Sequence, residues 1–378
     1  MRISSLQKNL KQGLSVVSHI AGKNSSLPIL NNILIEAKDG NIKLITTNLE
    51  IGIVYSVRGK VEEEGMFTVD SKVVSDYVSL LPNKRVDIKK DEKSLIIETE
   101  NYKTKILGQE AEDFPLIPSI EKDCFYKVNA SELKKALSQV IFAVSNSETR
   151  MELSGVLFDF NDGKLVVVST DSYRLAEKEV KIETNVKNGE NKKIIIPAKT
   201  IQELIKILSG VRDDDAIEGD MKDVEFYVSE NQVMFSFGPV ELISRLIEGQ
   251  YPDYRQIIPG ASKTKVVIVK DELVRAVKMA SLFSKTGIND VNLDFPKGKN
   301  TALISSISGQ AGENMTELSA EVVGEDNGVV INHRYFLDGL NNFDSENILI
   351  EVIDNNTPCI LRPEKGDGYL YLIMPIKQ

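Results

Sequence analysis

Three pairs of amphipathic helices are the most regular feature of the hydrophobic pattern. In each of three segments, apolar residues recur at i, i+4 and i+7, which places them on one face of a helix. These sets are Leu10, Leu14 and Val17; Leu133, Leu137 and Val140; and Leu273, Val277 and Ala280. A second apolar helix follows each first helix at a similar distance. The six predicted helices cover residues 5–21, 70–83, 131–144, 198–210, 271–285 and 332–345.

Between the helices lie short runs of β-branched and aromatic residues that are broken by turn signals. Asp39-Gly40 and Asp162-Gly163 stand at the same place in the first two repeats, and both predict hairpin turns between strands. A helix with one apolar stripe must bury that stripe against a sheet. We therefore predict an α+β fold of three repeated domains, each with two helices packed on antiparallel sheets, at residues 1–124, 125–253 and 254–378. Ser131 and Asp271 are the predicted N-caps of two first helices.

Composition narrows the function without identifying it. The chain has 378 residues and a net charge of −10, which excludes a uniformly basic nucleic-acid coat but permits a local basic stripe. There are two cysteines and two histidines, and His19 and His333 fall in predicted amphipathic helices. We find no nucleophile–base pair, no metal-ligand spacing, no signal peptide and no apolar run of membrane length. We expect a cytosolic chain with no cofactor, no metal site and no catalytic residues.

The polar faces of the predicted helices carry most of the functional signal. Together the six helices have a small positive charge, although the chain is acidic overall. Lys8, Lys11 and Lys135 lie away from the apolar stripes, as do Lys199, Lys206 and Arg275. Such cations can be ordinary solvated residues, or they can contact the phosphates of nucleic acid, which requires no base-reading geometry. The pattern alone leaves both interpretations open.

Short motifs along the whole chain resemble those of bacterial sliding clamps, the β subunits of DNA polymerase III. They are LPIL at 27–30, TNLE at 47–50, DFP at 113–115, TDSYRLA at 170–176, YPDYRQIIP at 251–259 and the final YLIMPIKQ. The resemblance implies a head-to-tail homodimer that forms a closed ring, with helices lining a hole through which double-stranded DNA passes without sequence preference. It implies a non-catalytic processivity factor in the bacterial cytoplasm, associated with the nucleoid during replication.

The resemblance also implies three sets of site residues. The DNA-facing cations would be Lys8, Lys11, Lys23, Lys72, Lys135, Arg150, Lys199, Lys206, Arg275, Lys278 and Arg334. The dimer interface would include Ile106, Leu282 and Phe283. A peptide-binding pocket would comprise Leu153, Thr170, Ser172, Tyr173, Arg174, Leu175, Pro252, Ile257, Asn332, Tyr335, Pro358, Leu372, Ile373, Met374 and Pro375. Tyr173 stands where the family commonly has His.

Partners of that pocket would be the replicative DNA polymerase, the clamp loader, repair polymerases and other proteins with a clamp-binding linear motif, and no membrane is implied. Leu, Ile, Met and Pro suit an apolar groove with a few polar anchors. The alternative function is an adaptor of three repeats that binds proteins but does not encircle DNA. Native mass, and retention on circular but not on linear DNA, would discriminate between the two.

Overall fold

The structure is a computed structural model, and it confirms all six predicted helices. It describes residues 1–22, 27–118, 120–123, 125–147, 149–161, 163–185, 192–210, 222–285, 287–366 and 368–377. The helices are α1 (Gln7–Val17), α2 (Ser71–Leu80), α3 (Ala130–Val140), α4 (Ala198–Gly210), α5 (Lys270–Ser281) and α6 (His333–Leu340). Within the described ranges, none of the helices has the length and apolar character needed to cross a membrane.

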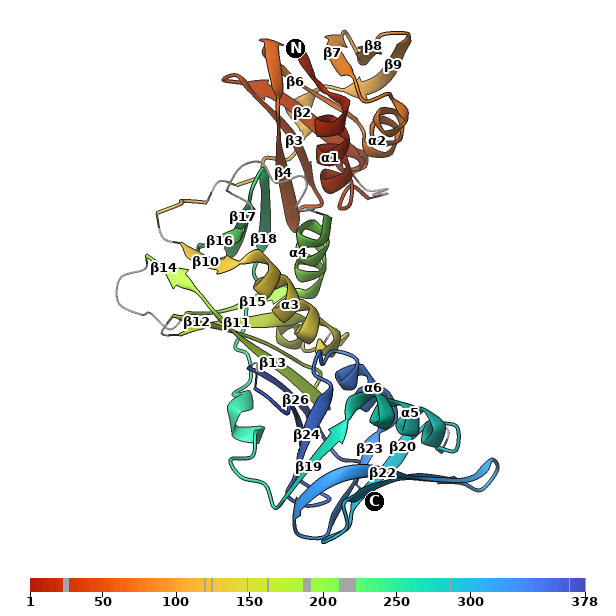
Figure 1. Cartoon of the computed structure of the whole chain (residues 1–378). Coiled ribbons are helices and arrows are strands. Elements are labelled where there is room, and N and C mark those ends of the chain that lie inside the picture. The colour runs from red at the N-terminus through yellow and green to blue at the C-terminus, as the bar shows by residue number, and fades with distance from the viewer. Residues whose placement is uncertain are drawn as a thin grey trace. The chain divides into compact units, whose positions relative to one another are not determined.

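Residue contacts divide the chain into two compact units (Figure 1). Unit 1 comprises Met1–Lys134, Ile182–Asn188 and Gln202–Leu246. Unit 2 comprises Lys135–Lys181, Gly189–Ile201 and Ile247–Gln378. The first predicted repeat therefore lies in unit 1, the third lies entirely in unit 2, and the middle repeat is divided between them, with α3 and α4 contributing to both.

Unit 1 is built on one antiparallel sheet with the strand order β14-β10-β16-β17-β18-β4-β3-β2-β6-β9-β8-β7-β1-β5. Its strands are β1 (Arg2–Leu6), β2 (Asn32–Lys38), β3 (Asn41–Thr47), β4 (Ile51–Val57), β5 (Gly59–Glu63), β6 (Gly65–Asp70), β7 (Arg85–Asp91), β8 (Ser94–Thr99), β9 (Tyr102–Gln109), β10 (Tyr126–Asn129), β14 (Glu183–Thr184), β16 (Asp223–Val228), β17 (Gln232–Phe237) and β18 (Val240–Arg245). Strand β18 of the middle repeat pairs with β4 of the first, so the sheet continues from one repeat into the next.

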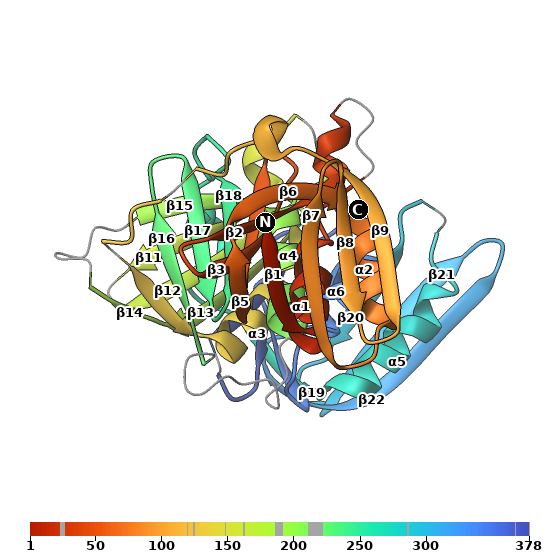
Figure 2. The same cartoon turned by 90° about the horizontal axis from the view of Figure 1, so that it is seen from above.

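Unit 2 has a second antiparallel sheet, with the order β15-β11-β12-β13-β26-β25-β24-β19-β22-β21-β20-β23. Its strands are β11 (Gly155–Asn161), β12 (Lys164–Thr170), β13 (Arg174–Lys181), β15 (Lys192–Pro197), β19 (Thr264–Val269), β20 (Asp290–Phe295), β21 (Thr301–Ser308), β22 (Gly312–Gly324), β23 (Asn327–Asn332), β24 (Asn347–Val352), β25 (Cys359–Pro363) and β26 (Tyr369–Ile373). Here β13 of the middle repeat pairs with β26 of the third. Figure 2 shows β21 and β22 as a long hairpin that runs past α5.

The helices bury the stripes that the periodicity predicted. Leu10, Leu14 and Val17 of α1 are buried, and α1 packs against α2 and strands β3 and β4. The corresponding apolar residues of α3 and α5 are also buried. The predicted N-cap of α3 is wrong, because the backbone N–H groups of Ser131 and Glu132 donate to Asn129 Oδ1. Helix α5 begins one residue before Asp271, which lies in its first turn.

The repeats share one turn in atomic detail. After β3, the Thr47 hydroxyl donates to the carbonyl of Ile51 at 2.9 Å, and Leu49 has φ +76°. After β12, the Thr170 hydroxyl donates to the carbonyl of Arg174 at 2.6 Å, and Ser172 has φ +78°. In both turns the side chain after the Thr, Asn48 or Asp171, accepts backbone N–H groups two and three residues on. The same polar side chains therefore end a strand in the same way in two repeats.

Candidate peptide groove and basic helix faces

The floor of the candidate groove is an apolar cluster within unit 2. Leu153, Leu175 and Leu372 are almost completely buried in it, and half-buried Met374 packs against its edge. Strand pairing explains this arrangement, because Leu175 of β13 and Leu372 of β26 are direct partners in the sheet. Leu153 ends a short 3-10 helix, η4 (Met151–Leu153), just before β11. The structure thus brings together residues that are separated by more than two hundred positions in the sequence.

The turn between β12 and β13 carries Ser172, Tyr173 and Arg174 of the predicted pocket, which we take as one rim of the candidate groove, and Arg174 holds this turn in place. Its guanidinium contacts Asp171 at 3.0 Å, Asp338 of α6 at 2.6 Å and the carbonyl of Phe142 at 3.1 Å. Burial lowers the pKa of Arg174, but the hydrogen bond to Asp338 and the attraction of Asp171 outweigh it and raise the pKa above its ordinary value. The charged guanidinium is therefore a fixed link between the turn and α6.

Two stacked tyrosine rings, of Tyr173 and Tyr335, pack next to the Arg174 guanidinium. Tyr173 is 62% exposed, and its ring stacks on that of Tyr335 with the centroids 6.2 Å apart. The guanidinium of Arg174 lies 4.5 Å from the Tyr335 ring centroid. Asn332 caps α6 by accepting the backbone N–H groups of Arg334 and Tyr335, which positions the first turn of this helix. An exposed aromatic surface supported by a buried charge is suited to contacting a partner side chain.

The fifteen predicted pocket residues do not all face one side. Side chains of β26 alternate, so Leu372 faces the apolar cluster while Tyr371 and Ile373 face the opposite way. Ile373 is completely buried and is the partner of Arg174 in the ladder. Thr170 is buried and supports the turn described above. The exposed or half-exposed members that can meet a ligand directly are Ser172, Tyr173, Pro252, Ile257, Asn332, Tyr335, Pro358, Met374 and Pro375.

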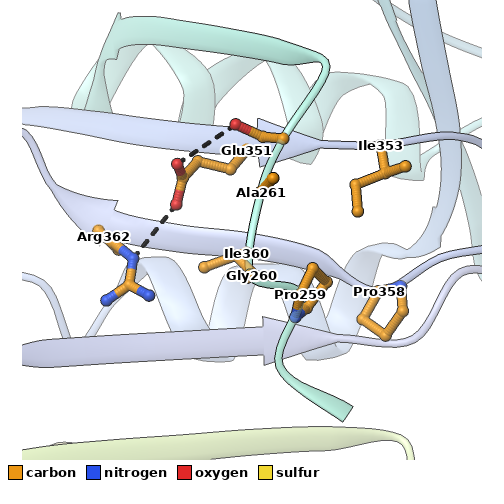
Figure 3. Close-up of a pocket in the computed structure, with 9 residues that line it drawn as sticks. Pro259, Gly260, Ala261, Glu351, Ile353, Pro358, Ile360 and Arg362 are labelled. Atoms are coloured by element: carbon orange, nitrogen blue, oxygen red, sulfur yellow. Dashed lines mark hydrogen bonds and ion pairs between the residues drawn. The ribbon is translucent and has the colours of Figure 1, made fainter. Parts of the chain in front are cut away.

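A cavity of about 220 Å³ adjoins the same cluster and takes in Pro358 (Figure 3). Pro259 and Pro358 line one end, where Ile353 also points inward. At the other end Arg362 donates to Glu351 at 3.2 Å, so the charges of this end are paired. Ile360 joins the cavity to the floor of the groove, because it belongs to the cluster that contains Leu372.

The predicted DNA-facing cations are exposed wherever the structure describes them. They are Lys8, Lys11, Lys72, Lys135, Arg150, Lys199, Lys206, Arg275, Lys278 and Arg334, whereas Lys23 lies outside the described residues. Lys135 pairs with Asp344 at 2.8 Å, and Lys206 pairs with Glu203 at 3.1 Å. Arg150 is not on a helix. It lies beside the groove, where it donates to Ser172 Oγ at 2.9 Å and pairs with Glu152.

His19 has a defined partner that the sequence did not reveal. Its Nδ1 lies 2.7 Å from Glu203 Oε1, just beyond the end of α1, and both residues belong to unit 1. Glu203 is nearly buried, which would raise its pKa, but the hydrogen bonds from His19 and Lys206 lower the pKa below its ordinary value. In the described part of the chain, His, Cys, Asp and Glu side chains form no group of three or more that could hold a metal ion.

Comparison with known proteins accounts for the whole chain. Sequence profiles of the DNA polymerase III beta subunit match its N-terminal domain at residues 1–118, its central domain at 127–253 and its C-terminal domain at 255–377. The chain belongs to this family.

Relatives of known identity agree with that assignment. The beta sliding clamp of Staphylococcus epidermidis is 31% identical over 363 residues, which is 93% of each chain. A crystal structure of the sliding clamp from Bacillus subtilis is 27% identical with a TM-score of 0.91, and it covers 100% of this chain and 99% of that one. A crystal structure of a beta subunit from Eubacterium rectale is 29% identical with a TM-score of 0.89 and complete coverage of both chains.

The structure of this sliding clamp places the three predicted interface residues differently. Ile106 in β9 is only 7% exposed and belongs to the core, whereas its neighbour Leu107 is 75% exposed. Leu282 is 74% exposed directly after α5, and Phe283 is half-buried. The exposed apolar side chain of β9 is therefore Leu107 and not the predicted Ile106, and the interface itself stays a prediction.

Sequence reasoning also missed several residues of the clamp that stand out in the structure. Val73 and Leu80 lie seven residues apart on the outer face of α2, where Val73 is 50% and Leu80 is 83% exposed. The signal was available in the sequence, because α2 has apolar residues on two faces. Asp338 was missed for a different reason, because nothing in the sequence indicates that it pairs with Arg174.

Proposed function

We propose that this chain is a non-catalytic DNA sliding clamp that acts as a ring-shaped head-to-tail dimer in the bacterial cytoplasm, at the nucleoid during replication. The ring would encircle duplex DNA and tether the replicative polymerase, the clamp loader, repair polymerases and other partners through the groove of unit 2. The observation that carries this proposal is the ordered match of the whole chain to the three domains of the family. The ring, the DNA and the partners are what we infer from it.

Exposed cations on the helices support a DNA-facing role. In the described ranges, no ion pair involves Lys11, Lys72, Lys199, Arg275, Lys278 or Arg334. They are spread over five helices, so a duplex would meet only a few at a time. Direct affinity for DNA should be weak and should fall steeply with salt. Each neutralised phosphate should add roughly 0.9 to the steepness of the plot of log affinity against log salt concentration. Retention on DNA would then depend on the closed ring.

The test is retention after loading. The clamp is loaded on a nicked circle with a cognate loader and ATP, and the complex is isolated at high salt. We expect the clamp to stay on the circle and to leave when the DNA is cut, because it slides off the ends. Retention on linear DNA with free ends would show that contacts hold it, and it would favour the adaptor.

A head-to-tail interface is supported by two complementary strand edges. Residues 102–107 of β9 pair only with β8 among the described strands, and this edge exposes Lys103, Lys105 and Leu107. Residues 312–319 of β22 pair only with β21 among them, and this edge exposes Glu313 and Glu317. Lys103 pairs with Glu98 and Lys105 with Asp91 in the single chain, and an acidic edge that faces these lysines would favour contact between the unit 1 edge of one copy and the unit 2 edge of another. A contact of this kind closes into a ring when its rotation permits.

Native mass spectrometry tests the dimer. The wild-type chain should be a dimer at micromolar concentration, and replacing Leu282 and Phe283 with Ala should give a folded monomer. Leu107→Asp should act in the same way from the other edge, because it places a charge in an apolar contact. As a matched control, Leu116→Asp changes a residue that is 95% exposed outside both edges and should leave the dimer intact. A wild-type monomer would remove the basis for the ring.

The groove of unit 2 is the proposed docking site for linear motifs of the Gln-Leu-x-Leu-Phe kind. Apolar anchors of such a peptide would reach Met374 and the Tyr173–Tyr335 surface, while Arg174 and Asp338 keep the rim in place. Met374→Ala should weaken binding of a labelled peptide by roughly tenfold or more, since truncated anchors in a buried contact typically cost above 1 kcal/mol. Met279→Ala, on α5 and 39% exposed, is the control. Equal peptide affinity in both variants would place the site elsewhere.

A further inference from the structure

A second cavity, of about 390 Å³, lies in unit 1 beside α1. Its walls come from α1, from the turn between β2 and β3, from the end of β4 with the residues that lead into β5, and from the turn between β17 and β18. All of these elements belong to unit 1. The volume falls in the range of small-molecule sites. Neither the groove of unit 2 nor the strand edges described above use this cavity.

The lining of this cavity is rich in hydrogen-bond donors and contains no acidic side chain. Arg58 lines it together with Gln12, Asn9 and Asn41, and the carboxamides of Asn9 and Asn41 each donate one hydrogen bond to a backbone carbonyl, of Arg58 and of Asp39 respectively. Gly40 and Gly238, both with positive φ, bring backbone to the wall without a side chain. The chain has 56 Asp and Glu residues, and none of them lines this cavity. Donors around a permanent positive charge are the groups that bind phosphate.

The walls are held in position before any ligand arrives. Asn9 Nδ2 donates to the carbonyl of Arg58 at 3.2 Å, which fixes α1 to the strand end that carries the guanidinium. The backbone N–H of Ser56 donates to the carbonyl of Pro239 at 2.8 Å, which fixes the β17–β18 turn to β4. Preformed walls lower the entropic cost of binding. Gln12 lies one turn after Lys8 on α1, so the cavity opens beside a cationic helix face.

We propose that this cavity is a phosphate-binding site centred on Arg58, with Gln12 and Asn41 as additional donors. Two sources of phosphate share this chemistry, namely a backbone phosphate of nucleic acid and the phosphate of a free nucleotide. The first source rests on the proposed function, because DNA must pass α1. Phosphate binding itself does not depend on the ring, so it can be tested without DNA, loader or dimer.

Titration of the full-length chain with inorganic phosphate, followed by calorimetry and phosphorus NMR, tests the proposal. Gln12→Glu keeps the size and helix propensity of the side chain but places a carboxylate in the cavity. We expect the dissociation constant for phosphate to rise by roughly tenfold or more in this variant, through charge repulsion. Gln202→Glu, an exposed substitution of the same kind on α4, should leave phosphate binding unchanged. Arg58→Gln should weaken binding as Gln12→Glu does.

Competition of DNA or a nucleotide with bound inorganic phosphate then identifies the natural source of the phosphate. If a short DNA duplex displaces bound phosphate and thymidine monophosphate does not bind more tightly than phosphate, the site holds a DNA backbone phosphate. If thymidine monophosphate binds more tightly and the duplex does not compete, the site holds a free nucleotide. Either result supports a phosphate site. The proposal is overturned if phosphate does not bind at millimolar concentration, or if Gln12→Glu and Gln202→Glu bind phosphate equally.

Discussion

Gly339 in α6 offers the sharpest test of how the groove is built. It occupies a position of the helix where the other repeats have apolar residues, and the ring of Tyr371 fills the space that a side chain would need. A Cβ atom at Gly339 would lie 2.2 Å from Tyr371 Cε1 and 2.4 Å from Cδ1. Tyr371 is completely buried and donates a hydrogen bond of 2.7 Å to the carbonyl of Tyr335. Gly339→Ala must therefore displace a ring that supports the groove.

Two opposing effects decide the size of the change. Replacing Gly with Ala inside a helix stabilises it by about 1 kcal/mol. Overpacking a core costs roughly 1–3 kcal/mol, and a buried hydrogen bond that is lost with the shifted ring adds about 1–3 kcal/mol. We expect the cost to exceed the gain, with a net loss of roughly 1–5 kcal/mol. At about 2–4 °C per kcal/mol for a unit of this size, the melting temperature should fall by roughly 2–20 °C.

Thermal and urea denaturation of the full-length chain measure this loss, with two further variants as controls. Gly210→Ala, at the end of α4, has no heavy atom within 4 Å of the new Cβ and should be neutral or slightly stabilising. In a Tyr371→Leu background, which removes the ring, Gly339→Ala should cost much less than in the wild type. A melting temperature of Gly339→Ala at or above that of the wild type would refute the packing argument.

Three further outcomes follow from contacts described above. Glu203→Gln should cost about 1 kcal/mol at neutral pH, a figure discounted because His19 is partly exposed. The folded-state pKa of Glu203 lies below its ordinary 4.5, so this stabilisation is present above pH 4.5 and is lost as the pH falls through the folded-state pKa. Denaturation should be measured near neutral pH and again in acid. The difference in stability between the wild type and Glu203→Gln should be smaller in acid. Asp171→Ala should lower the stability of unit 2 by roughly 1–3 kcal/mol, because two backbone N–H groups and Arg174 lose their acceptor, and peptide affinity should fall with it; equal urea midpoints would contradict this. Arg275→Gln should reduce the slope of log affinity for DNA against log salt by up to about 0.9 without changing peptide affinity, as measured by fluorescence anisotropy.

The helices were predictable because their stripes are long and regular. Leu10, Leu14 and Val17 repeat with helical spacing and are buried, and the predicted turn at Asp39-Gly40 joins β2 to β3, whereas Asp162 lies outside the described residues. The orientation of short strands was less predictable. A shift of one residue in a strand turns every side chain to the other face, so Ile106 was expected at a surface that Leu107 actually occupies.

The parts of the site that depend on distant contacts could not be read from the sequence. Arg174 was predicted at the groove from a motif, but its link to Asp338 depends on α6 packing beside the β12–β13 turn. Arg150 was predicted among the DNA-facing cations, and no sequence pattern indicated that it contacts Ser172 beside the groove. The pairing of β13 with β26 joins the middle and third repeats, and nothing in the sequence of β13 indicates that β26 is the strand beside it. The predicted domain boundaries stay a prediction.

Strand pairing between repeats has a mechanical consequence. The joint of the first and middle repeats is the ladder of β4 and β18, and the joint of the middle and third repeats is the ladder of β13 and β26, each with five paired positions. Bending at such a joint would stretch several backbone hydrogen bonds together, so both joints should be stiff. Among the described strands, residues 102–107 of β9 and 312–319 of β22 pair on one side only. We expect a force applied to an assembled clamp to break the contacts between copies at those edges before it separates repeats within a chain. A ring would then open at the interface between copies.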